Sequence, residues 1–140
     1  FFVAAFDERI KAAVSSCGFS SFAGDPNPER WGKREEWFSH IPKVTEYLNR
    51  GQIPFEFHEV AAAIAPRAFL NWSTQNDHIF PHWEAVGQAM KAVKKLYDGL
   101  NFSEQFVSIL GTGEHSFPKL IRTLAYEWLD QKLANHHAKQ

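Results

Sequence analysis

The spacing of apolar residues along the chain predicts three short strands. Small, mostly apolar residues run over 12–17 and stop at Gly18, a pattern typical of a strand that is buried on both faces. Residues 68–72 and 106–110 form two further apolar runs, each followed by polar or glycine-rich residues. We therefore expect three strands that lie inside the fold.

Helical periodicity occupies the stretches between and around these strands. Apolar residues recur about every 3.6 positions over 81–99 and again over 118–133, with a proline at the start of each stretch. A shorter helix is predicted over 56–65, where Pro66 stops it. Residues 1–6 are interpreted as the last turns of a helix whose beginning lies upstream.

The long stretch 19–54 shows neither the apolar runs of the predicted strands nor the 3.6-residue period of a helix. Glycine and proline punctuate it, and a loop of this length in a compact domain is usually functional, so we interpret it as a lid-like insertion. Its aromatic residues Trp31, Trp37 and Phe38 either line an acyl or sugar pocket or simply pack the loop against the domain.

The alternation of strands and helices predicts the α/β fold class. In such folds the crossovers are right-handed, and helices cover both faces of a parallel sheet. Three strands are few for this architecture, which usually has about five or six. We therefore interpret residues 1–140 as a partial domain, the C-terminal part of a larger sheet whose earlier strands precede Phe1.

Composition and charge exclude several classes of protein. The chain is 44% hydrophobic and 15% aromatic, which is too apolar for a disordered segment. Because 15 Lys and Arg face 16 Asp and Glu, no basic surface is expected for nucleic acid. The longest apolar runs are six residues, against the roughly 18 that a membrane span needs. The single cysteine, Cys17, excludes an intramolecular disulfide.

Two residues with acid–base chemistry follow neighbouring strands. Asp77 comes shortly after the second predicted strand, and His115 follows the third. The carboxyl ends of parallel strands meet at one edge of a sheet, and adjacent strands lie roughly 4.8 Å apart, so these side chains are expected to meet. A histidine that acts as a general base needs a carboxylate on its other ring nitrogen. The sequence therefore predicts that Asp77 and His115 form an acid–base pair.

Each member of this pair also has a plainer interpretation. His115 is one of seven histidines, and a loop aspartate such as Asp77 is often only a turn former. A zinc site made of His78, His82 and His115 is disfavoured, because His78 precedes Pro81 and falls outside the helix that would align it with His82.

A hydrolase built on this pair still needs a nucleophile. In the α/β-hydrolase order the serine comes first, on a G-x-S-x-G turn between a strand and a helix, and the chain contains no such motif. Ser15 and Ser16 lie in a predicted buried strand rather than on a sharp turn, and Cys17 is interpreted as a small buried residue rather than a reactive thiol. The nucleophile is therefore expected upstream of residue 1.

Several segments carry a resemblance to a known family. They are 2–11 with Cys17-Gly18, 54–59, 65–67, Asp77 and 113–118. In these segments the chain resembles the C-terminal half of α/β-hydrolase esterases of the dienelactone-hydrolase and acetyl-xylan-esterase type. The resemblance covers nearly the whole chain apart from 19–54, and its most specific parts are Ala65-Pro66-Arg67 and the histidine loop 113–118.

The resemblance implies a carboxylic ester hydrolase with a Ser-His-Asp triad. The family's acid and base positions match Asp77 and His115, whereas its nucleophile and both oxyanion-hole donors belong to the N-terminal half and match nothing here. The expected substrate is a small-molecule ester, with Trp31, Trp37 and Phe117 as the substrate-binding residues. No metal or organic cofactor is implied. The chain alone is expected to be inactive and to require the N-terminal half of the same hydrolase as its partner.

A second hypothesis involves no catalysis. The chain would then be a non-catalytic α/β module, or a structural half that works only by docking to a partner segment. Such a half would expose the sheet edge at which the earlier strands should pair, and an exposed edge is a liability unless another segment covers it.

Overall fold

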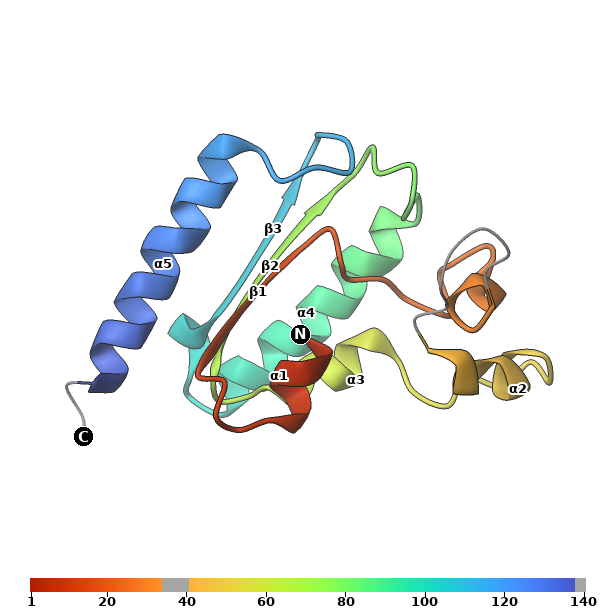
Figure 1. Cartoon of the computed structure of the whole chain (residues 1–140), viewed down its shortest axis with the longest axis horizontal. Helices are drawn as coiled ribbons and strands as arrows, with labels where there is room; N and C mark the ends of the chain where they lie inside the picture. The colour runs from red at the N-terminus through yellow and green to blue at the C-terminus, as the bar shows by residue number, and fades with distance from the viewer. Residues whose placement is uncertain (34–40, 138–140) are drawn as a thin grey trace.

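The centre of the structure is a parallel sheet of three strands. A computed structural model gives the structure, and its description covers residues 1–33 and 41–137. The strands are β1 (Ala12–Ser16), β2 (Ala68–Thr74) and β3 (Phe106–Gly111), in the spatial order β1-β2-β3 (Figure 1). The parallel pairing confirms the predicted α/β class and all three predicted strands.

The middle strand, β2, is longer than the sequence pattern predicts. All of its residues are buried. The predicted strand ends at residue 72, yet Ser73 and Thr74 continue the ladder opposite Leu110 and Gly111 of β3. Their polar side chains favour a loop, but the backbone groups that form a ladder do not depend on side-chain polarity. The extension carries β2 up to the turn that holds Asp77.

Helices cover both faces of the sheet, as predicted. The short helices α1 (Phe2–Phe6) and α3 (Phe57–Ala62) lie with the long helix α4 (Trp83–Gly99) on one face, and α5 (Lys119–His137) crosses the other (Figure 1). In the described part of the chain, none of the helices is both long enough and apolar enough to cross a bilayer.

Two helices differ from their predicted bounds. The helix predicted over 56–65 ends at Ala62, where the backbone bonds tighten to a three-residue spacing, from Ile64 N–H to Ala61 O and from Ala65 N–H to Ala62 O. The helix predicted to open at Pro81 begins at Trp83, because the residues that follow Asp77 are held in turns by its carboxylate.

The main core lies between the sheet and the α3–α4 face. Phe57, Phe69 and Tyr97 have no exposed surface. The ring of Phe69 on β2 lies 5.9 Å from that of Phe106 and 6.0 Å from that of Phe1, measured between centroids. Such aromatic pairs add stability beyond the area they bury, so the centre of the sheet is fixed by ring packing.

The segment after β1 packs onto this core rather than standing clear of it. It contains the short helices η1 (Pro28–Trp31), η2 (Pro42–Val44) and α2 (Thr45–Leu48), and it lies at the end of the molecule away from α5 (Figure 1). The Glu56 carboxylate, which caps α3, also accepts hydrogen bonds from the N–H groups of Phe22 and Ala23. Trp37 and Phe38, which the sequence places in the same insertion, lie outside the described residues.

Removing the ring at the centre of the sheet tests this packing. We expect Phe69→Ala to lower the free energy of unfolding by about 3–5 kcal/mol, because the deletion leaves a cavity that the surrounding rings cannot fill. Urea denaturation of the purified protein measures the change. The control is Leu120→Ala on α5, where the side chain is 77% exposed and a change below about 0.5 kcal/mol is expected. Equal losses in the two variants would contradict the placement of this core.

Candidate functional site

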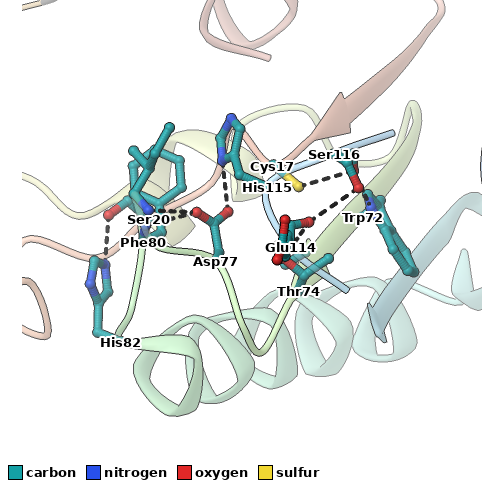
Figure 2. Close-up of polar contacts among 12 residues, drawn as sticks. Cys17, Ser20, Trp72, Thr74, Asp77, Phe80, His82, Glu114, His115 and Ser116 are labelled. Atoms are coloured by element: carbon teal, nitrogen blue, oxygen red, sulfur yellow. Dashed lines mark hydrogen bonds and ion pairs between the residues drawn. The ribbon is translucent and has the colours of Figure 1, made fainter. Parts of the chain in front are cut away.

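The structure brings the predicted acid–base pair into contact. Asp77 lies in the turn after β2 and His115 in the loop after β3, so both leave the sheet at the carboxyl edge of their strands. The Nδ1 atom of His115 lies 2.8 Å from Oδ2 of Asp77 (Figure 2). Because an ionised carboxylate only accepts hydrogen bonds, Nδ1 carries the proton and donates it, which leaves Nε2 of the neutral ring as the acceptor.

The Asp77 carboxylate is fixed on both of its oxygens. The side chain is 3% exposed, so its charge needs compensating donors. Oδ1 accepts the N–H groups of Ile79, at 2.8 Å, and of Phe80, at 3.0 Å. Oδ2 is thereby left for His115. This turn around the carboxylate holds Ile79 and Phe80 outside the helix, and α4 starts at Trp83.

Donors from β2 and the turn after it hold the backbone of the histidine loop. The indole N–H of Trp72 donates to the Ser116 carbonyl at 2.9 Å, and the Thr74 hydroxyl donates to the Glu114 carbonyl at 3.2 Å (Figure 2). The Asn76 side chain donates to the Thr112 carbonyl at 2.8 Å. Carbonyls on both sides of His115 are therefore anchored, which positions the backbone from which the imidazole reaches Asp77.

The sequence analysis missed these anchoring residues. Trp72 reads as an ordinary apolar strand residue, yet its indole crosses β3 at Gly111, where an added Cβ would lie 2.2 Å from the ring. Gly111 is thus required for the crossing. The sequence holds only a weak indication of this contact, namely a tryptophan near the end of one strand and a glycine at the end of its neighbour.

Aromatic rings surround the exposed side of the pair. The ring of Phe80 lies 5.7 Å from that of His115 and stacks on Trp31 at 5.6 Å with an interplanar angle of 5°. Phe80 therefore contacts both the histidine ring and the Trp31 ring. Trp31 also lines an apolar cavity of about 980 Å³ beside β1, whereas Phe117 is not among the described residues that line it. Trp37 lies outside the described residues.

The three histidines weighed for a zinc site do not share one position. His82 is buried, and its Nε2 lies 2.8 Å from the Ser20 hydroxyl, with Phe80 between its ring and that of His115 (Figure 2). His78 is exposed, and its ring lies 6.2 Å from that of His115.

The structure instead places Cys17 beside the acid–base pair. In the part of the chain that it describes, the potential ligand atoms of Cys17, Asp77 and His115 lie within 4.8 Å of one another.

The strand-end residues Ser15, Ser16 and Cys17 differ in their surroundings. Ser15 and Ser16 both belong to β1 and line the cavity beside it. Cys17 follows with a positive φ of 48°, is buried, and donates its S–H to the Ser116 carbonyl at 3.5 Å. Burial raises the pKa of the Cys17 thiol, so the sulfur is protonated at neutral pH.

Comparison with known proteins identifies the fold. No family model and no curated protein matches the sequence. Among solved structures, the chain is similar to a carbohydrate esterase family 15 (CE15) glucuronoyl esterase from Caldicellulosiruptor kristjansonii, with a TM-score of 0.69 and 22% sequence identity. The similarity covers 96% of this chain and 40% of that chain. The chain therefore shares the α/β fold of part of an esterase and spans less than half of that protein's length.

Replacing the indole that holds the histidine loop tests the anchoring. Trp72→Phe keeps a ring but removes the N–H, so we expect the free energy of unfolding to fall by about 0.5–1.5 kcal/mol and amide exchange across 112–118 to accelerate. Urea denaturation and hydrogen-exchange mass spectrometry measure the two effects. Trp83→Phe, at a half-buried indole that makes no hydrogen bond within the described residues, is the matched control. Unchanged exchange in Trp72→Phe would exclude the anchoring role.

Buried His82 predicts a specific acid sensitivity. Burial lowers the pKa of His82 below its ordinary value of 6.5, so the folded state binds fewer protons than the unfolded state as the pH falls. The stability that His82 contributes is therefore complete above about pH 6.5 and is lost as the pH falls through the lowered pKa. In His82→Gln, which keeps a polar partner for Ser20, this loss is expected to disappear. Unfolding free energies of both proteins between about pH 7.5 and 5 measure it; a constant difference across that range would refute it.

Proposed function

We propose that this chain supplies the acid and the base of a serine ester hydrolase. The contact of 2.8 Å between His115 Nδ1 and Asp77 Oδ2 carries the proposal. With Nδ1–H held by the carboxylate, Nε2 accepts the proton of a serine hydroxyl as that oxygen attacks the ester carbonyl. The imidazolium that forms is stabilised by Asp77 and later protonates the leaving alcohol. The His115 side chain is 31% exposed, so the ring is open to a nucleophile and a substrate.

The nucleophile and the oxyanion-hole donors come, in this proposal, from a segment that precedes Phe1 in the complete hydrolase. Three observations support it. The outer edge of β1 pairs with no strand in the described part of the chain, and the cavity beside it is lined by Phe1, Val14 and Val60, among others. An unpaired edge next to an apolar cavity of about 980 Å³ suits a further strand and helix. The esterase of similar fold is also much longer than this chain.

The surroundings of His115 favour a small ester with an apolar or ring-shaped part. Phe80 packs against the histidine, and Trp31 stacks behind Phe80. Because the structural neighbour is a carbohydrate esterase by name, acetylated and uronic-acid sugar esters belong in the assay beside a simple aryl acetate. Trp31, Trp37 and Phe117 remain the proposed substrate contacts.

The experiment uses the protein that includes the preceding segment. A fluorophosphonate is expected to label a serine there, and His115→Ala is expected to reduce turnover of p-nitrophenyl acetate by at least ~10³-fold. Asp77→Asn is expected to reduce turnover by about 10²–10⁴-fold, since the histidine loses its fixed tautomer. His58→Ala, on α3, is the control with little effect. The 140 residues alone are expected to give no turnover.

Two outcomes would overturn the proposal. Retained turnover in His115→Ala would remove the base from the mechanism. Absence of any covalent adduct, in a folded protein, would favour the alternative that the chain is a non-catalytic α/β module or a structural half that works only by docking.

A further inference from the structure

Three different metal-binding groups meet at the carboxyl edge of the sheet. Cys17 follows β1, Asp77 follows β2 and His115 follows β3, and their potential ligand atoms lie within 4.8 Å of one another (Figure 2). No other group of three such residues is this close in the part of the chain that the structure describes. The proposed hydrolysis uses the aspartate and the histidine but leaves the thiol without a role.

The chemistry of the donors selects the kind of ion. Thiolate, imidazole and carboxylate together suit a borderline-soft divalent ion such as Zn²⁺, whereas Mg²⁺ and Ca²⁺ prefer oxygen ligands alone. Tetrahedral zinc with bonds of about 2.0–2.3 Å holds its ligand atoms roughly 3.4 Å apart. Because the sulfur lies within 4.8 Å of the other two ligand atoms, an approach of at most about 1.4 Å brings it to this spacing, and the Asp77–His115 contact of 2.8 Å opens by about 0.6 Å.

We propose that Cys17, Asp77 and His115 form a zinc site that switches off the acid–base pair. The metal takes the place of the proton between His115 Nδ1 and Asp77 Oδ2, and water fills the fourth position on the exposed side of His115. The ring proton moves to Nε2, and the thiol proton leaves to solvent, so binding releases one proton. A thiolate and a carboxylate then balance the two positive charges of the ion, which leaves the buried site neutral.

The regulatory consequence rests on the proposed function. With Nε2 protonated and Nδ1 bound to the metal, His115 has no free nitrogen to accept the proton of a serine. His115 therefore cannot bind zinc and act as the general base at the same time. The metal site itself requires only the three side chains, so it can be tested without turnover.

The first experiment reads the metal–sulfur bond directly. Co²⁺ is added to the purified protein under reducing conditions as a spectroscopic substitute for Zn²⁺. We expect a near-ultraviolet charge-transfer band from sulfur to cobalt, together with strong visible bands of tetrahedral cobalt, and both should vanish when Zn²⁺ is added. Because Cys17 is the single cysteine of the chain, any such band identifies its sulfur.

Variants decide whether the three residues act together. Cys17→Ser keeps a hydroxyl that can donate to the Ser116 carbonyl, and it should lose the charge-transfer band and weaken Zn²⁺ binding at least ~10-fold in a competition assay with a chromogenic chelator. Asp77→Asn, nearly unchanged in shape, should lose the tetrahedral visible bands. His78→Gln is the matched control, because His78 lies near His115 but outside the set of ligands. Circular dichroism confirms that each variant is folded.

Several results would overturn the zinc site. These are a missing charge-transfer band in the wild-type protein, full Zn²⁺ affinity in Cys17→Ser, or equal losses in His78→Gln and Asp77→Asn.

In the protein that carries the serine, Zn²⁺ should inhibit turnover. The inhibition constant should rise at least ~10-fold in Cys17→Ser, measured against that variant's own turnover. A protein that binds Co²⁺ through Cys17 yet shows no esterase activity would keep the metal site and refute only the proposed function.

Discussion

The site depends on one buried carboxylate. Asp77 is almost fully enclosed, so its charge is tolerated only with donors on both oxygens. The N–H groups of Ile79 and Phe80 satisfy Oδ1, and His115 satisfies Oδ2. The first two bonds shape the turn that delays α4, and the third sets the tautomer of the histidine. The start of a helix and the direction of an imidazole therefore follow from the same electrostatic requirement.

Side chains of the middle strand, β2, anchor the loop that carries His115. β2 is buried along its whole length and pairs with a neighbour on each side. Its Trp72 and Thr74 side chains hold the carbonyls of the histidine loop, and Gly111 leaves room for the indole to cross. The loop after β3 is thus anchored to β2 as well as to its own strand. This explains how an exposed loop can present His115 in one orientation.

The two sides of the sheet differ in how complete they are within the described residues. β1 and β3 are both edge strands among the described residues, but α4 covers β2 and β3, while β1 borders an apolar cavity. A similar fold occurs within a glucuronoyl esterase that is much longer than this chain. The acid–base pair lies at the carboxyl edge of the sheet, where Cys17 follows β1.

The sequence alone determined the order of strands and helices, the α/β class and the pairing of Asp77 with His115. These depend on the spacing of apolar residues and on the rule that parallel strands end at one edge, both of which are local or topological. The tertiary structure decided the extension of β2 through Ser73 and Thr74, the late start of α4, the role of Trp72 and the position of Cys17 beside the pair. The late start of α4 follows from the local turn around Asp77, and each of the others results from contacts between residues far apart in the chain. Cys17 and His115 are neighbours only because the sheet brings the ends of β1 and β3 to one edge, which no spacing pattern along the sequence records.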